Sequence, residues 1–587
     1  MGRGFAEIIS GELQGSPLRY AIQSRTLRAF DASLGQRPGA PGISAESAGA
    51  VVAGANEIVY GDFSAINGVL RASATEEDLS THKMVLTASA SGPASDGIFP
   101  VAEALARQLG ELRPFGTQNP QALRSYVAAL ESPDAAAASQ DLAQAAADDP
   151  GFGRAYVLWL DMAIAQRDRA EADRVVEQAR AHQDRFPALD RAGLDLAAAA
   201  VRGDFHAQLE ALRELAHLDP ADPNGHRALA EALMSLRDYA GAIVEFRRAL
   251  SIRPDDAASL NSMGYAAAYS GDLPTAIRVL RGYEQLRPNE PNPLDSLGDA
   301  HFALGHFAEA EQFYLAAQAK APGFLNGGEV LKAAQARLMT GDVLGATALF
   351  NRYLAAREAA HDPHAPYLAA EWSWQTGARR AAIASLDRLA QTMTRADATG
   401  PMRDVASRAD AQTAIWLLNL GDRAGAAQHA RKAVSEAVPA PSPMVALAAF
   451  LAQPDAFPPP AQSPLRDYAR AYALLFDKQF QPAEQALEEI RRRPTGEQDD
   501  GFDVLLAWAC EETGAWQRAE PLLRLTPLPQ ASGLPMFSSL YFPRLFFLRG
   551  AALDHTGHRA EAARYYQLFR TLSGPDSAIR GEERRAR

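Results

Sequence analysis

The chain has 587 residues, 47% of them hydrophobic, and is long enough for several domains or one long array of repeats. Its formal net charge of −13 argues against a nucleic-acid-binding surface, because such surfaces are basic. No stretch approaches the ~18 apolar residues of a membrane span, and the first residues lack the apolar core of a signal peptide. We expect a cytoplasmic protein from the sequence as written. An extracytoplasmic location is the alternative if a membrane anchor precedes it.

Residues 1–116 are predicted to form a small α/β domain. The predicted elements, in chain order, are a helix over 5–14, a strand-like run over 18–24, a helix over 44–53, strands over 56–66, 69–75 and 84–90, and a helix over 98–109. The pair Asn67-Gly68 between two of these strands predicts a type I′ hairpin turn. Residues 113–116 are the predicted linker to the rest of the chain.

From about residue 120 onward nearly all of the sequence is predicted to be helical. Four prolines, Pro220, Pro254, Pro288 and Pro322, follow one another at a constant interval of 34 residues. A repeat of this length is typical of stacked helix–turn–helix units. Such arrays present an extended surface for binding, which the spacing predicts here.

Small and large residues recur at matching positions between these prolines. Gly264 and Gly298 would let paired helices approach closely, and Tyr314 would fill the space between neighbouring pairs. Gly271 and Gly305 would supply the left-handed backbone that ends a helix. Since one helix pair cannot cover its own apolar face, we expect the units to stack.

This pattern closely resembles the tetratricopeptide repeat (TPR), with the best units at 223–256, 257–290 and 291–324. The resemblance implies a mainly α fold, a right-handed α-solenoid of about ten or eleven helix pairs that follows the small α/β domain. The predicted boundaries are an array over 117–453, a proline-rich break over 454–464, a C-terminal lobe of degenerate repeats over 465–572 and a polar tail over 573–587.

Residues 4–110 resemble the TolB amino-terminal-like or FlgO-like domain of bacterial TPR signalling proteins. The similarity is carried by the run from Gly54 to Phe63 and by Asp96-Gly97-Ile98-Phe99 before a helix. That family opens with a strand before its first helix, whereas this sequence begins at the helix. The first strand is therefore expected to be missing.

No motif in the sequence points to catalysis or to a cofactor. The Gly-rich phosphate loop, H-E-x-x-H, C-x-x-C, the EF-hand loop and G-x-S-x-G are all absent. His361 and His364 flank Asp-Pro, which favours a solvated loop between repeats over a metal site. Cys510, the single cysteine, lies in an apolar helical run and is predicted to be a buried, unreactive thiol. We expect a non-enzymatic protein without a metal or a cofactor.

The six tryptophans are predicted to pack in the core or between repeats. Trp372 and Trp374 are two residues apart, so on a helix they cannot face the same way. One of the two is expected to be partly exposed.

In TPR arrays the first helix of each unit lines a concave groove, and the resemblance carries that role over to eight positions. The expected groove residues are Asn224, Arg227, Glu231, Asn261, Tyr265, Asp295, Asp299 and Phe302. Their mixed polar, charged and aromatic character suits an extended peptide or a helix of a partner protein. The carboxylates among them oppose an acidic ligand, so a basic or neutral ligand is expected.

The sequence thus predicts a scaffold that mediates protein–protein interaction by capturing a peptide or helix in its groove. The alternative is a sensor or regulatory module of a bacterial signalling protein, of the kinase, cyclase or winged-helix regulator type, that lacks its effector domain.

Overall fold

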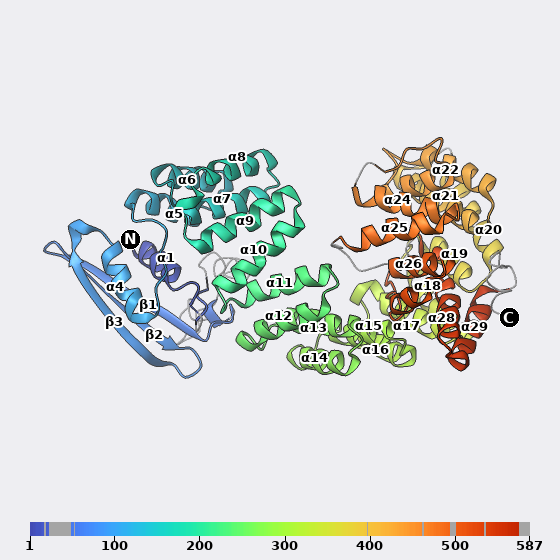
Figure 1. Cartoon of the computed structure of the whole chain (residues 1–587), viewed down its shortest axis with the longest axis horizontal. Coiled ribbons are helices and arrows are strands. Elements are labelled where there is room, and N and C mark those ends of the chain that lie inside the picture. Colours follow the sequence, from blue (N-terminus) through green and yellow to red (C-terminus); the bar gives the residue numbers. More distant parts are fainter. Residues whose placement is uncertain are drawn as a thin grey trace. The chain divides into compact units, whose positions relative to one another are not determined.

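A computed structural model describes residues 1–16, 19–22, 49–51, 53–395, 397–460, 463–493, 501–532 and 536–574. Within these ranges the chain is mainly α, with one small sheet near the N-terminus (Figure 1). It divides into two compact units, Met1–Leu233 with Gly241–Ser259, and Met234–Ala240 with Leu260–Arg587. No helix in the described ranges combines the length and the apolar character that a membrane span requires.

The N-terminal part of the first unit is a three-stranded antiparallel sheet covered by two helices. Its elements are α1 (Gly2–Glu12), β1 (Glu57–Ile66), β2 (Val69–Asp78), β3 (Lys83–Pro93) and α4 (Phe99–Leu109). The strands lie in the order β1-β2-β3, α4 packs against β2 and β3, and α1 packs against α4. On β2, alternate side chains such as Leu70, Ala72 and Ala74 are buried, as expected of a strand with one covered face.

The predicted hairpin turn is confirmed. Ile66 pairs with Val69, and the two residues between them have positive φ, 52° at Asn67 and 76° at Gly68. Residues 19–22 of the predicted strand-like run are not in a strand; the rest of that run, and most of the predicted helix over 44–53, lie outside the described residues. The small α/β character is thus present, with all three strands in one meander.

Helices follow one another through the rest of the chain. The first of them are α5 (Pro120–Glu131), α6 (Ala135–Asp148), α7 (Gly153–Ala165), α8 (Arg169–Arg180), α9 (Ala188–Arg202), α10 (Phe205–Leu218), α11 (Pro223–Ser235), α12 (Tyr239–Ile252), α13 (Ala257–Tyr269), α14 (Leu273–Leu286), α15 (Asn292–Ala303) and α16 (Phe307–Lys320). The remainder are α17 (Gly328–Met339), α18 (Val343–Ala359), α19 (Ala365–Gln375), α20 (Arg379–Met393), α21 (Gly400–Asn419), α22 (Arg423–Glu436), α23 (Pro443–Ala452), α24 (Ser463–Phe476), α25 (Phe480–Arg491), α26 (Phe502–Glu512), α27 (Trp516–Leu522), α28 (Arg544–His555) and α29 (Arg559–Ser573). Successive helices pack in pairs, as in α15 with α16, α17 with α18 and α28 with α29.

A glycine–aspartate turn joins the two helices of several pairs. The glycine has positive φ, for example 87° at Gly271, and so ends the first helix. The aspartate that follows caps the second helix through its carboxylate, which accepts a backbone N–H from the first turn. The capping contacts are Asp204 to Ala207 (3.1 Å), Asp272 to Thr275 (3.0 Å), Asp342 to Gly345 (2.9 Å) and Asp422 to Gly425 (2.9 Å).

The four prolines of the 34-residue interval mark helix ends, as predicted. Helices α10, α12, α14 and α16 end at Leu218, Ile252, Leu286 and Lys320, and each end lies two residues before its proline. Proline cannot donate the backbone hydrogen bond that would extend a helix, so the repeat of prolines sets the repeat of helix pairs.

The small residues of the repeats hold the helices of a pair together at close range. A Cβ atom added to Gly298 of α15 would lie 2.5 Å from the ring of Tyr314 on α16, and one added to Gly264 would lie 2.5 Å from Leu280. Contacts this short force the neighbouring ring or the backbone to move.

We therefore expect Gly298→Ala to destabilise the second unit by about 1–3 kcal/mol. The matched control is Gly282→Ala on α14, where the new Cβ would meet only Leu260 at 3.9 Å. Because alanine is more stable than glycine in the interior of a helix, this control should be neutral or should stabilise the unit by about 0.5–1 kcal/mol. Urea denaturation of the two variants tests the difference, and equal midpoints would contradict it.

The expectation that Trp372 or Trp374 is partly exposed is wrong, since each is only 5% exposed. They do point to opposite sides of α19, but both sides are covered. Trp372 stacks on Phe350 of α18 with ring centroids 4.6 Å apart, and Trp374 stacks on Trp416 of α21 at 4.5 Å. A helix that lies between neighbours on two faces buries both tryptophans.

Candidate functional site

The eight predicted groove residues all lie on the first helices of their repeats, but their exposure differs. Glu231 is exposed, and Asn224, Arg227, Asn261 and Tyr265 are half-buried. Asp295, Asp299 and Phe302 on α15 are buried, with exposed fractions of 6%, 6% and 1%. All eight were expected to line an open groove, whereas the three residues of α15 are buried within the chain.

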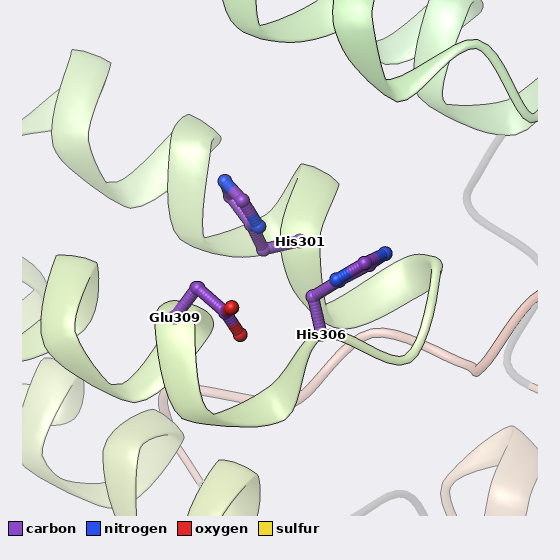
Figure 2. A group of neighbouring side chains, drawn as sticks. All are labelled: His301, His306 and Glu309. Carbon is purple, nitrogen blue, oxygen red and sulfur yellow. The ribbon is translucent and has the colours of Figure 1, made fainter.

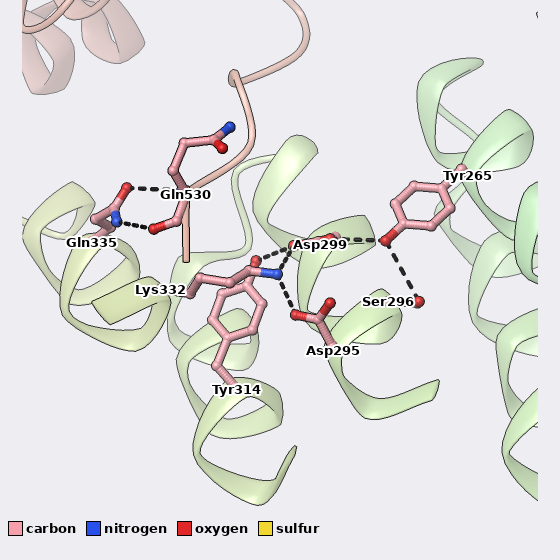
Figure 3. Close-up of polar contacts among 8 residues, drawn as sticks. All are labelled: Tyr265, Asp295, Ser296, Asp299, Tyr314, Lys332, Gln335 and Gln530. Carbon is pink, nitrogen blue, oxygen red and sulfur yellow. Dashed lines mark hydrogen bonds and ion pairs between the residues drawn. The ribbon is translucent and has the colours of Figure 1, made fainter. Parts of the chain in front are cut away.

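A buried polar network explains the position of the two aspartates (Figure 3). Lys332 of α17 forms ion pairs with Asp295 and, at 2.8 Å, with Asp299. Asp299 also accepts hydrogen bonds from the hydroxyls of Tyr265 and Tyr314, each at 2.8 Å. The ammonium group of Lys332 lies 4.6 Å from the centre of the Tyr314 ring. One lysine therefore joins residues of helices α13, α15, α16 and α17.

Burial and charge shift the pKa values in this network. Burial, together with the nearby Asp295, raises the pKa of Glu329 on α17 to about 8. Burial and Asp299 raise the pKa of Asp295 to about 6, although Lys332 opposes that rise. Burial alone would lower the pKa of Lys332, but the carboxylates of Asp299 and Asp295 raise it above its usual value. Lys332 therefore stays charged. Its positive charge offsets part of the negative charge of Asp295 and Asp299, which had led us to expect a basic or neutral ligand.

A segment of the chain itself lies across the helices that carry this network. Residues 524–532, here called the covering segment, follow α27 and contain no helix or strand. Its Thr526 donates a backbone hydrogen bond to the carbonyl of Ala303 at the end of α15, 2.8 Å away. The carbonyl of Ala531 lies against Gly328 at the start of α17, where an added Cβ would meet it at 2.3 Å.

Gln335 of α17 binds the main chain of the covering segment at two points (Figure 3). Its side-chain Nε2 donates to the carbonyl of Gln530 at 2.9 Å, and its Oε1 accepts from the backbone N–H of the same residue at 3.3 Å. The hydroxyl of Tyr353 on α18 donates to the carbonyl of Ala531 at 3.5 Å. These hydrogen bonds are made to backbone groups of the covering segment, so they do not depend on its side chains.

Arg549 of α28 holds the other end of the covering segment. Its guanidinium donates to the carbonyl of Leu523 at 2.8 Å and to the hydroxyl of Thr526 at 3.0 Å. The side chains of Thr526 and Pro529 are buried. Helices α15, α17 and α18 therefore contact a proline-containing stretch of polypeptide that is neither helix nor strand.

In the first unit, an N-terminal segment touches a predicted groove residue in a similar way. Asn224 of α11 donates from Nδ2 to the hydroxyl of Tyr20 at 3.1 Å. The neighbouring Arg19 pairs with the buried Glu76 of β2 at 2.6 Å. Residues 19–22 also line a hollow of about 1820 Å³, whose wall includes parts of α1, β1 and α12. Chain segments outside the repeats thus contact the first helices of repeats in both units.

Two predicted locations are confirmed: the loop position of His361 and His364, and the burial of Cys510. His361 and His364 lie in the loop between α18 and α19, where Asp362 accepts the backbone N–H of His364 at 3.0 Å. Cys510 is buried, and burial, with the nearby Glu484, raises the pKa of its thiol to about 12.

Lys332, Glu329 and Gln335 were missed by the sequence analysis, which ended its best repeats at residue 324. The series Arg227, Asn261 and Asp295 advances by 34 residues, and one further step reaches Glu329. The period therefore carried a signal for the α17 position. Nothing in the period pointed to residues 524–532, which approach α15 and α17 from far along the chain.

Residues 228–256 match the family model of the tetratricopeptide repeat. No curated protein sequence matches the chain. Among solved structures, the chain is similar to PilW, a widely conserved type IV pilus biogenesis factor (14% identity, TM-score 0.30, covering 35% of this chain and 95% of that one). It is also similar to YrrB, a TPR protein with an unusual peptide-binding site (12%, 0.28, 31% and 94%), and to MamA from Desulfovibrio magneticus RS-1 (19%, 0.25, 28% and 92%).

The chain therefore carries a TPR unit within a mainly α solenoid that has a small α/β part. The domain boundaries drawn from the sequence, and the resemblance of residues 4–110 to the TolB-like domain, stay predictions.

Proposed function

We propose that this protein is a non-enzymatic scaffold that binds an extended peptide of a partner protein on the first helices of its repeats. The observation that carries the proposal is the way Gln335 binds both main-chain groups of Gln530. An extended strand that needs hydrogen-bond partners for its backbone finds them in one side chain. The covering segment thus stands in for such a ligand within the chain.

The chemistry of the covering segment indicates which ligands suit this groove. Pro527 and Pro529 remove two backbone donors, so few N–H groups need partners in the groove. Both prolines also favour an extended conformation before binding, which lowers the entropy lost on binding. The one charged residue of the covering segment is Arg524 at its start, whose side chain is exposed. The ligand class we propose is a neutral, proline-containing extended peptide.

A peptide with the sequence of residues 523–532 tests this mode of binding. In the intact chain the covering segment competes at an effective concentration on the order of millimolar, so the labelled peptide should bind weakly. A variant in which residues 525–530 are replaced by a Gly/Ser stretch of equal length should bind it measurably better by fluorescence anisotropy. Adding Gln335→Ala to that variant should weaken binding at least about tenfold, since two hydrogen bonds are lost.

Gln391→Ala on the exposed surface of α20 is the matched control and should leave the peptide affinity unchanged. Circular dichroism of each variant establishes that the helices are retained. A folded Gly/Ser variant that does not bind the peptide would overturn the proposal for this groove. Binding that is insensitive to Gln335→Ala would do so as well.

The role of the half-buried and exposed positions Asn224, Arg227, Glu231, Asn261 and Tyr265 in binding a partner also stays a proposal. The alternative of a sensor module that lacks its effector domain rests on the resemblance of residues 4–110, and stays a prediction.

A further inference from the structure

The turn between α15 and α16 brings two histidines and a glutamate together (Figure 2). His301 lies in the last turn of α15, His306 precedes α16, and Glu309 lies in the first turn of α16. One ligand atom from each of the three side chains lies within 4.8 Å of the other two. The short glycine turn at Gly305 produces this grouping, because it folds α16 back beside the end of α15.

The environment of His301 is the main indication that this group binds a ligand. Its side chain is only 8% exposed, and its Nδ1 atom is buried without a hydrogen-bond partner. A buried polar atom without a hydrogen-bond partner lowers the stability of the fold, and such atoms are rare in native proteins. One face of the ring stacks near Phe313, with centroids 5.2 Å apart, and its edge faces His306.

A second histidine–carboxylate group in the chain provides a contrast. His429 of α22 binds Asp410 through Nδ1 at 2.6 Å and lies 3.5 Å from Asp387 through Nε2. Both of its ring nitrogens therefore already lie within ion-pair distance of a carboxylate oxygen. In the group at the α15–α16 turn, by contrast, the buried Nδ1 of His301 has no hydrogen-bond partner.

From this geometry we propose that His301, His306 and Glu309 form a binding site for a divalent transition metal of the zinc class. Two imidazoles and one carboxylate are a ligand set that zinc uses where a fourth position is left open to water. Ligand atoms of a tetrahedral zinc lie roughly 3.3 Å apart, given bonds of about 2.0–2.1 Å. His306 and Glu309 are exposed and can rotate to reach that spacing.

The surroundings of the site are compatible with a cation. The buried Nδ1 of His301 has no hydrogen-bond partner, so in the tautomer that leaves a lone pair on this atom it can coordinate a metal. Glu309 supplies negative charge. The cation that faces His301, Arg281, forms an ion pair with Glu284 and lies over the Phe313 ring. A bound metal would join the end of α15 to the start of α16, and this role is independent of peptide binding.

The test uses the full chain, freed of metal by a chelator and titrated with Zn²⁺ by calorimetry and with Co²⁺ by visible absorption. We expect one equivalent of Zn²⁺ to bind, and Co²⁺ to give the visible bands of a low-coordinate nitrogen and oxygen site. The double variant His306→Gln, Glu309→Gln changes only exposed side chains, so it should remain folded. It should weaken Zn²⁺ binding at least tenfold and remove the rise in thermal midpoint that Zn²⁺ produces.

The matched control, His361→Gln with His364→Gln, removes two histidines from a different interhelix loop and should leave Zn²⁺ binding unchanged. Zn²⁺ binding that survives the double variant, or that is lost in the His361 and His364 variant instead, would overturn the proposal. Absence of Zn²⁺ binding to the intact, folded chain would overturn it too.

Discussion

Lys332→Met is expected to lower the local stability of helices α15 to α17 by about 3–5 kcal/mol. The substitution preserves most of the side-chain volume but removes the charge that Asp295 and Asp299 share. Two buried carboxylates would then lie beside each other without a cation. Hydrogen exchange of the α15 and α17 amides measures the effect locally, which suits a long chain that need not unfold in one step.

Two further variants make this prediction specific. Lys320→Met removes an exposed lysine that donates to the carbonyl of Pro288, and it should change exchange by less than about 1 kcal/mol. Adding Asp295→Asn and Asp299→Asn to Lys332→Met should restore much of the lost protection, because no buried charge is left without a partner. Equal effects of Lys332→Met and Lys320→Met would contradict the role of the network.

The second large effect concerns pH and Glu329. Its pKa rises from 4.5 to about 8 in the folded protein, so the folded state holds a proton that the unfolded state releases at lower pH. This contribution to stability is complete below pH 4.5 and is lost as the pH rises through about 8. The slope can reach roughly 1.4 kcal/mol per pH unit in that window. The contribution of Glu329 to the stability of the second unit should therefore fall between pH 5 and about pH 8.

Glu329→Gln keeps the shape of the protonated side chain and cannot ionise. Relative to the wild type, it should gain stability from pH 5 to about pH 8 and then level off, in urea denaturation followed by tryptophan fluorescence. The difference between the two proteins isolates Glu329 from other groups that titrate. Glu358→Gln, on the exposed end of α18, is the control and should run parallel to the wild type. A pH-independent difference for Glu329→Gln would contradict the buried, protonated state.

The covering segment connects these two predictions with the proposed binding mode. Lys332 and Gln335 lie one helical turn apart on α17, so the residue that stabilises the network and the residue that binds the segment share one helix. Lys332→Met is therefore not a suitable test of peptide binding, since it would disturb both. Gln335→Ala changes the hydrogen bonds to Gln530 and leaves the ion pairs intact.

Local features of the chain could be read from the sequence because neighbouring residues determine them. Proline cannot extend a helix beyond its first turn, so Pro220, Pro254, Pro288 and Pro322 predicted four helix ends correctly. Asn67-Gly68 and Gly271 adopt positive φ for steric reasons that need no tertiary contact. The repeat of small residues likewise predicted the close approach at Gly264 and Gly298.

Exposure and partners, by contrast, were decided by tertiary structure. Asp295, Asp299 and Phe302 occupy positions that the resemblance to TPR arrays assigned to a groove, yet they are buried. Lys332 of α17 pairs with the two aspartates, and Thr526 bonds to the neighbouring Ala303. Trp374 is buried by α21, more than forty residues away in the chain. A 34-residue period describes only contacts between adjacent repeats. It contains no information about a lysine or a distant segment that folds back onto them, and these set the charge, the burial and the free surface of the candidate site.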